Sequence, residues 1–139
     1  MYRRIIVGLD GSLGSRRALE TAIALARTMK AELFLVSIME LPHYPGAIDE
    51  VEDEQHTAQR FFGQVQKEAA EQVTAAGLVA HGDIRVGHAG KALPQYAQEK
   101  HGDLLVIGHS GRSGVWGKVL GATADKIVDH APCSVLVVR

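Results

Sequence analysis

The chain has 139 residues, of which 46% are hydrophobic and 22% charged, and its net charge at pH 7 is -1. This length fits one domain with a substantial core, which we expect to span residues 1–139. A near-neutral charge and an aromatic content of 5% are unlike a nucleic-acid-binding protein, which needs a basic surface and stacking rings. The single cysteine, Cys133, cannot form an internal disulfide. We therefore expect a cytoplasmic protein with no membrane insertion.

The first part of the chain predicts a strand, a helix and a second strand. Residues 5–9 form a short, apolar, β-branched run that is typical of a buried strand. The turn Asp10-Gly11-Ser12 follows it. Ser12 is suited to cap a helix over about residues 14–30, where apolar side chains recur at helical spacing. The apolar run 33–38 predicts a second buried strand.

The middle of the chain predicts a long helix and a less apolar strand. An acidic run over residues 49–54 is expected to occupy the first turn of this helix, because carboxylates there complement the helix dipole. This interpretation is favoured over a metal site, since nothing in the spacing holds the carboxylates on one face. The helix should end near Gly77. Residues 79–86 predict a third strand, whose modest apolarity suits the edge of a sheet.

The last part of the chain predicts two shorter helices and two strands. Apolar residues around Leu93 predict a short helix, and residues 104–107 predict a fourth strand. A helix over residues 123–131 is expected to stop at Pro132, and residues 134–138 predict a fifth strand. The inner side of that last helix should carry Ala124, Ile127, Val128 and Ala131.

Strands and helices therefore alternate along the whole chain. This order predicts one α/β domain with a doubly wound, Rossmann-like fold: a five-stranded parallel sheet of order 3-2-1-4-5 with helices on both faces. Ligands of such sheets bind beyond the carboxyl ends of the strands, where the winding reverses. The segments that leave the first and fourth strands, Asp10-Gly11-Ser12 and Gly108 onward, are therefore the expected site.

The segment from Gly108 to Gly121 has the composition of a phosphate-binding loop. It holds five glycines in fourteen positions, which let a backbone turn freely and approach an anion closely. The N-terminus of the next helix adds free N–H groups and a positive dipole end. The alternative is a plain flexible loop that allows the helix to pack.

Two common phosphate motifs are excluded by spacing. A P-loop requires Gly-x4-Gly-Lys-Ser/Thr, but around Gly117-Lys118 the first glycine position is Arg112 and the hydroxyl position is Val119. A dinucleotide fingerprint requires Gly-x-Gly-x-x-Gly after the first strand. The turn that begins at Gly8 has different spacing.

Three segments give the chain a resemblance to a known family. They are Ile6-Val7-Gly8-Leu9-Asp10-Gly11-Ser12, Gly108-His109-Ser110-Gly111-Arg112-Ser113-Gly114 and His130-Ala131-Pro132-Cys133-Ser134-Val135-Leu136-Val137-Val138. Over essentially its whole length the chain resembles the universal stress protein family. Gly108, Gly111 and Gly121 match the Gly-x2-Gly-x9-Gly-Ser/Thr spacing of the family's ATP-binding subgroup.

The resemblance implies an ATP site and roles for individual residues. Asp10 would contact the ribose or a phosphate-bound magnesium ion, and Ile38 would offer backbone groups to the adenine. Gly108 and Gly111 would bracket the ribose and phosphates. Arg112 is a further candidate contact, with a solvated surface charge as its alternative. An Asx-turn or helix cap is the structural alternative for Asp10, and a purely core position is the alternative for Ile38.

The outer phosphates would be held by Gly121 and the two residues that follow it. Here the chain departs from the subgroup, because Ala122 stands where Ser or Thr is expected. Its N–H remains, but a hydroxyl donor is lost, at a cost of about 1.5–3 kcal/mol or roughly ten- to a hundredfold in affinity. Thr123, one position on, is a second candidate donor whose direction the sequence does not fix.

The sequence carries no legible catalytic signature, so an enzyme is not expected. Neither a Gly-x-Ser-x-Gly elbow nor a Cys/His nucleophile pair can be identified. The leading hypothesis is a regulatory, ATP-binding stress protein. The alternatives are a slow ATPase or phosphotransfer protein, with Asp10 holding a divalent ion, and an interaction module that no longer binds nucleotide. An apolar edge strand over residues 134–138 predicts a homodimer, which the family resemblance also implies.

Overall fold

The computed structural model describes residues 1–40, 48–109 and 121–139, except for the side chains of residues 48–51. Helices and strands alternate along these residues as the sequence predicts. In chain order the elements are β1 (Arg4–Gly8), α1 (Leu13–Met29), β2 (Glu32–Met39), α2 (Ile48–Ala75), β3 (Ala80–Val86), α3 (Ala89–Glu99), β4 (Leu104–Gly108), α4 (Ala122–His130) and β5 (Ser134–Val138).

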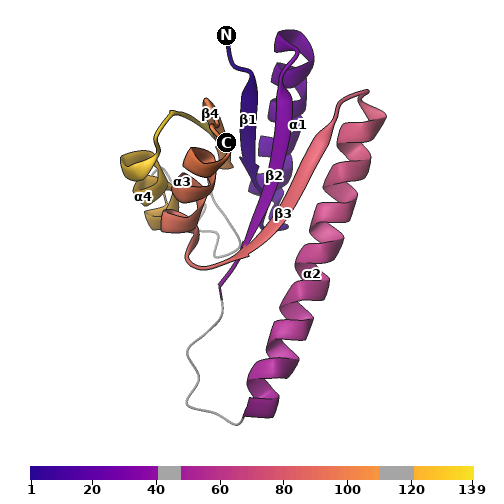
Figure 1. The fold of residues 1–139 in the computed structure, drawn as a ribbon, viewed down its shortest axis with the longest axis vertical. Coiled ribbons are helices and arrows are strands. Elements are labelled where there is room, and N and C mark those ends of the chain that lie inside the picture. The colour runs from indigo at the N-terminus through magenta and orange to yellow at the C-terminus, as the bar shows by residue number, and fades with distance from the viewer. Residues whose placement is uncertain (41–47, 110–120) are drawn as a thin grey trace.

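The five strands form one sheet in the order β3-β2-β1-β4-β5, and each neighbouring pair is parallel. The predicted doubly wound, Rossmann-like fold and its strand order are therefore confirmed. Figure 1 shows α1 and α2 on one face of the sheet and α3 and α4 on the other. Both faces of the central strands are covered, which is why their sequences are nearly continuous apolar runs.

Alternate residues of the central strands pack into two separate cores. On the α1 and α2 face, the buried cluster includes Ile5, Val7 and Leu35. On the α3 and α4 face, it includes Ile6 and Val36. Successive side chains of a strand point to opposite faces, so a strand that is buried on both faces is apolar at nearly every position.

The first helix is fixed at both ends by local backbone chemistry. Ser12 caps α1 as predicted, because its Oγ accepts a hydrogen bond of 3.1 Å from the Ser15 N–H. The C-terminal end is closed by Lys30, whose φ of 56° is left-handed. These ends place the start of α1 directly after the turn that leaves β1.

Polar contacts tie the edge strand β3 to α3. The Tyr96 hydroxyl donates to Asp83 Oδ2 at 2.9 Å, and the Arg85 guanidinium makes two hydrogen bonds to the Glu99 carboxylate at 2.9 and 3.1 Å. Burial, followed by the hydrogen bond to Asp83, raises the pKa of Tyr96. The Arg85 guanidinium lowers the pKa of Glu99. The edge of the sheet is thus anchored by a neutral phenol and an ion pair.

Two expectations about individual helices are corrected by the structure. Val128 does not face the core, because its side chain is 43% exposed and α4 buries only Ala124 and Ile127. A nine-residue helix that contacts the sheet along one narrow stripe leaves the adjacent position in solvent. The acidic run lies only partly in the first turn of α2. Since α2 begins at Ile48, Asp49 and Glu50 lie in that turn as expected, whereas residues 52–54 lie beyond it.

Candidate functional site

The central strand β1 is shorter than both of its neighbours at the carboxyl edge of the sheet. Its last partner on β2 is Val36, yet β2 continues to Met39. Its last partner on β4 is Val106, yet β4 continues to Gly108. The ends of β2 and β4 therefore project past β1, and a crevice opens between them where the winding reverses.

The main chain of Ile38 is directed toward this crevice. Backbone groups of successive strand residues point to alternate neighbours, and the Val36 carbonyl accepts from the Leu9 N–H at 2.9 Å on the β1 side. The Met39 carbonyl accepts from the Gly87 N–H at 3.1 Å on the β3 side. Ile38 lies two residues after Val36, so its N–H and C=O point to the same side as those of Val36. On that side β1 has already ended.

The crevice is a cleft of about 970 Å³, large enough for a nucleotide. Six of the predicted site residues line it together: Asp10, Ile38, Gly108, Gly121, Ala122 and Thr123. They come from four different elements or their ends, so only the fold brings them together. The other two predicted site residues, Gly111 and Arg112, lie outside the residues that the structure describes.

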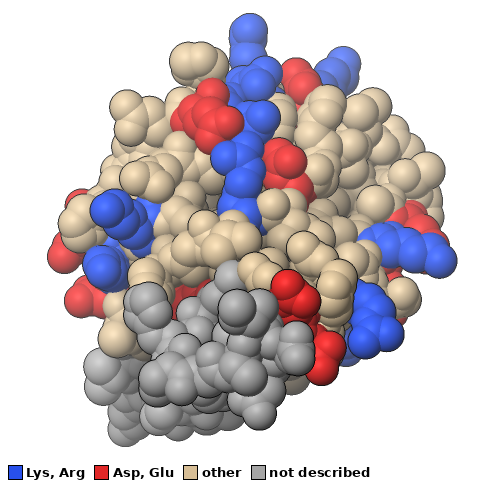
Figure 2. All heavy atoms as spheres, turned by 60° about the horizontal axis from the view of Figure 1, so that its bottom comes forward, with Lys and Arg blue, Asp and Glu red and all other residues tan. Residues whose placement is uncertain are grey.

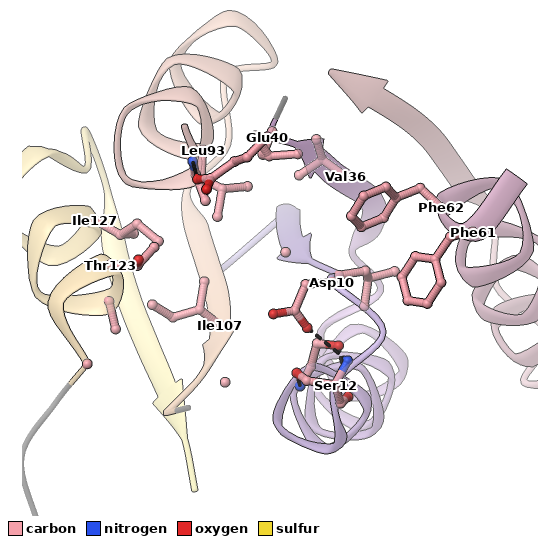
Figure 3. A pocket seen from close by; sticks show the side chains of 18 of the residues that line it. Asp10, Ser12, Val36, Glu40, Phe61, Phe62, Leu93, Ile107, Thr123 and Ile127 are labelled. Atoms are coloured by element: carbon pink, nitrogen blue, oxygen red, sulfur yellow. Dashed lines mark hydrogen bonds between the residues drawn. The ribbon is translucent and has the colours of Figure 1, made fainter. Parts of the chain in front are cut away.

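Asp10 forms the Asx-turn that the sequence left open as its structural alternative, and the residue also lines the cleft. Its Oδ1 accepts a hydrogen bond of 2.9 Å from the Ser12 N–H, so the residue does form an Asx-turn. The same side chain lines the cleft, and Figure 3 shows it reaching toward Ile107. The turn therefore holds the carboxylate in place at the mouth of the crevice.

Steric packing bears differently on the two described glycines of the Gly-rich segment. A Cβ on Gly108 would lie 2.5 Å from the carbonyl carbon of Gly14, so this glycine is required for α1 to pack against β4. A Cβ on Gly121 would have His109 O as its nearest neighbour, at 3.8 Å, and the φ of −59° is ordinary. Packing among the described residues therefore explains Gly108 but does not explain Gly121.

The residues at the start of α4 line the cleft. Gly121 occupies the N-cap position and provides no side-chain hydrogen bond. The first N–H groups of a helix have no partner within it, and they carry the positive end of its dipole. Ala122 and Thr123, which follow, both line the cleft. This corner is suited to an anion.

An apolar wall, which the sequence analysis missed, closes the opposite part of the cleft. Phe61 and Phe62 of α2 meet edge to face, with ring centroids 5.1 Å apart. Leu93 of α3 and Val36 of β2 continue the wall, and Figure 3 shows the two rings beside Val36 and Asp10. The sequence analysis assigned this stretch to a long helix, which does not reveal that the two phenylalanines line a ligand-sized space.

Acidic side chains dominate the charge of the described lining. Asp10, Glu40, Asp53 and Glu54 all line the cleft, whereas the described lining residues include no Lys or Arg. Across the face seen in Figure 2, basic and acidic side chains are intermixed rather than gathered into a field of one sign. Asp53 and Glu54 belong to the acidic run that the sequence analysis assigned to the helix dipole.

The described part of the chain contains neither a metal-binding cluster nor a membrane-spanning helix. Within it, no group of three or more His, Cys, Asp or Glu side chains could hold a metal ion by itself. No helix in residues 1–40, 48–109 and 121–139 is both long and apolar enough to cross a membrane.

Cys133 lies outside the cleft lining, and burial raises the pKa of its thiol, which disfavours the reactive thiolate.

Several solved structures share this fold. The universal stress protein UspA from Lactobacillus plantarum superposes with a TM-score of 0.90, at 24% identity and with 99% and 98% of the two chains covered. A universal stress protein solved in complex with cAMP has a TM-score of 0.77 at 26% identity, with 99% and 97% covered. One from Archaeoglobus fulgidus, in complex with dAMP, has a TM-score of 0.70 at 20% identity, with 99% and 98% covered.

Sequence comparison identifies the family directly. A putative universal stress protein of Staphylococcus epidermidis is 33% identical over 143 residues, covering 99% of this chain and 84% of the relative. A universal stress protein of Methanocaldococcus jannaschii is 28% identical over 147 residues, covering 100% and 83%. The model of the universal stress protein family matches residues 1–139. Because this match spans the whole sequence, the chain belongs to the universal stress protein family.

Proposed function

We propose that this protein binds an adenine nucleotide, with ATP as the leading candidate, in the cleft at the end of β1. One observation carries the proposal. Because β1 ends before β2 does, the main chain of Ile38 faces a nucleotide-sized cleft. The start of α4 forms another side of this cleft. The cleft thus offers a paired backbone donor and acceptor at one side and an anion-binding helix end at another.

The chemistry of the cleft suggests how the ligand lies. The N–H and C=O of Ile38 complement the acceptor and donor on the edge of an adenine, and the apolar wall of Val36, Leu93 and Phe62 suits a flat ring. The helix end at Gly121 suits phosphates. The base is therefore expected near β2 and the phosphates near α4.

Asp10 fits a magnesium ion that accompanies the phosphates. A carboxylate beside a polyphosphate is repelled unless a cation lies between them, and Mg²⁺ prefers oxygen ligands from one or two carboxylates plus phosphates. When bound, the ion would neutralise this repulsion. Asp10 is held for such a role by its hydrogen bond with the Ser12 N–H.

The similar structures with cAMP or dAMP bound support a ligand of this class. We propose a regulatory role in a stress response, in which the bound nucleotide controls shape or association, rather than catalysis. A slow ATPase is the second candidate, because Asp10 reaches into the space where a metal-bound phosphate would lie. An interaction module that has lost nucleotide binding is the third.

Nucleotide content and binding separate these functions. The purified protein is denatured and the released small molecules are identified by mass spectrometry, and the nucleotide-free protein is then titrated calorimetrically with ATP, ADP and AMP, with and without magnesium. Asp10→Asn keeps an oxygen for the Ser12 N–H but removes the charge, and Asp129→Asn, on the exposed side of α4, is the matched control.

The possible results are distinct. If Asp10→Asn weakens nucleotide binding only when magnesium is present, the result supports the proposal. If the wild-type protein releases phosphate from ATP and the variant does not, the result supports the ATPase. The absence of binding by any nucleotide would refute the first two functions and leave the interaction module.

We also propose that β5 pairs with a second copy of the chain. The strand lies at an edge of the sheet, and four of its five side chains are only partly buried. The Val138 carbonyl accepts from the His109 N–H on the β4 side at 2.7 Å, so the alternate residues Val135 and Val137 point their backbone groups outward. A second strand can bind there.

A further inference from the structure

We propose that Glu40 reads the 6-position of the purine and makes the cleft prefer a 6-amino base over a 6-oxo base. The inference deepens the proposed nucleotide binding and rests on it. Glu40 lies immediately after β2, two residues beyond Ile38, and lines the cleft.

The position of the Glu40 side chain is fixed by the start of α3. Its Oε1 accepts a hydrogen bond of 2.9 Å from the Ala89 N–H, the first residue of that helix. His88 is the N-cap residue of α3, and its own side chain makes no capping hydrogen bond. Glu40 takes over this role from another element, so its carboxylate is held in one place although its side chain is 53% exposed.

Only one of the two carboxylate oxygens is occupied by this contact. The neighbouring His88 Nδ1 also approaches Oε1, at 3.9 Å. Oε2 has no hydrogen bond from any residue in the described part of the chain. Figure 3 shows the Glu40 side chain extending across the cleft from β2 toward Leu93. A fixed acceptor therefore lies at the rim beside the apolar wall.

The distance along the strand suits a purine that is bound at Ile38. Residues two apart in a strand are separated by about 6.6 Å, which is comparable to the width of a purine. A base whose edge meets the Ile38 main chain thus extends its 6-substituent toward the end of β2. Val36 and Ile38 share one face of the sheet with Leu93, and the Glu40 side chain reaches α3 on that face.

The chemistry of an ionised carboxylate makes this position selective. Such a group only accepts hydrogen bonds. The 6-amino group of adenine donates to it, whereas the 6-oxo group of hypoxanthine or guanine is itself an acceptor and is repelled. A site built to hydrogen-bond a ligand rejects an analogue that lacks the matching group.

Adenine and inosine nucleotides test the inference, because their bases differ only at position 6 and in the hydrogen that hypoxanthine carries on N1. The main chain of Ile38 responds to these differences in every variant, so the change in preference between wild type and Glu40→Gln isolates the contribution of Glu40. Calorimetric titrations with the pairs ATP/ITP and AMP/IMP should show that the wild-type protein prefers the adenine member by about tenfold or more. In Glu40→Gln, the amide oxygen still accepts from Ala89 while the amide N–H₂ becomes a donor toward the base. We expect the adenine preference to fall by about tenfold relative to wild type, through weaker adenine and stronger inosine binding, while the part that the Ile38 main chain sets remains.

Glu52→Gln is the matched control, because it removes the same charge from an exposed position of α2 that does not line the cleft. It should keep the wild-type preference. Thermal unfolding of Glu40→Gln checks that α3 remains capped. An equal adenine-to-inosine ratio in wild type and Glu40→Gln, with adenine binding intact, would overturn the inference alone. A wild-type protein that binds neither nucleotide would overturn the proposed function together with it.

Discussion

Gly108 at the end of β4 and Gly14 in the first turn of α1 approach so closely that a Cβ on Gly108 would lie 2.5 Å from the Gly14 carbonyl carbon and 2.7 Å from its oxygen. Backbone atoms cannot move aside as the end of a side chain can. The first glycine of the Gly-rich segment is therefore needed for the helix that follows β1 to lie against β4, whatever the cleft binds.

Gly108→Ala should destabilise the fold by about 2–3 kcal/mol, because an overpacked contact with rigid backbone must be relieved by moving α1. Urea unfolding followed by circular dichroism measures this change. Gly63→Ala is the matched control, since nothing lies within 4 Å of a Cβ at this position in α2. It should stabilise the protein by about 0.5–1 kcal/mol. Equal effects of the two substitutions would contradict the steric explanation.

Gly121→Ala should behave in the opposite way from Gly108→Ala. The site has room for a Cβ and an ordinary φ, so the unfolding free energy should stay within about 0.5 kcal/mol of wild type. A methyl group at the start of α4 would nevertheless keep phosphates from the N–H groups, and ATP affinity should fall by about tenfold or more. Calorimetry checks the affinity. Unchanged ATP binding would show that the phosphates lie elsewhere.

Ala122→Ser restores the hydroxyl that the ATP-binding subgroup carries at this position. Because the residue lines the cleft as the first residue of α4, the new donor should strengthen ATP binding by about tenfold or more. Ala122→Val is the size control, since it adds bulk without a donor. The gain should be absent for adenosine, which has no phosphates. A gain that is equal for adenosine would mean that the hydroxyl contacts another part of the ligand.

Tyr96→Phe should remove a pH-dependent part of the stability. The folded-state pKa of Tyr96 is raised above the ordinary value of 10.0, so the contribution of the protonated hydroxyl is fully present below about pH 10 and is lost as the pH rises further. The loss should be about 1 kcal/mol at pH 7, because Asp83, the acceptor, is partly exposed. Urea unfolding between pH 7 and 11 measures it.

Tyr2→Phe provides the comparison for Tyr96→Phe. The Tyr2 hydroxyl makes no hydrogen bond to any residue that the structure describes, so this change should cost less than about 0.5 kcal/mol at pH 7. A difference between wild type and Tyr96→Phe that stays constant from pH 7 to 11 would be inconsistent with the raised pKa.

Val137→Pro tests the proposed pairing of β5. The N–H of Val137 points away from β4, so its removal leaves the internal ladder intact while blocking a strand that adds to this edge. Light scattering at micromolar concentration should give a dimer for the wild type and a monomer for Val137→Pro. A monomeric wild-type protein would contradict the pairing.

The fold was accessible to sequence analysis because the physics of each element is local. Strands such as residues 33–38 are apolar at every position except Ser37, and Ser12 is a cap that acts on the residues beside it. Together with the strict alternation of helices and strands, these signals were sufficient for the strand order. Val128 was misplaced because periodicity gives the direction of an apolar stripe but not its width.

The candidate site could be predicted only in part, because sequence patterns record local physics and the site also depends on contacts between distant segments. Asp10 and Gly121 belong to recognisable segments, whereas Glu40 and Phe61 enter the cleft from residues that have no motif. The Oε1 of Glu40 meets the Ala89 N–H across a sequence separation of 49 residues. Such a contact depends on where β2 ends relative to α3, which no local pattern records.

The main chain of Ile38 contacts the cleft because β1 stops before its neighbours do. Recognition of this kind does not depend on which side chain residue 38 carries, so substitutions there can accumulate while the ligand is kept. Insertions and deletions have a different effect. Two residues added to the end of β1 would extend the ladder beside Ile38 and fill the crevice with backbone. In this fold, the relative lengths of three adjacent strands are therefore an inherited property of the binding site.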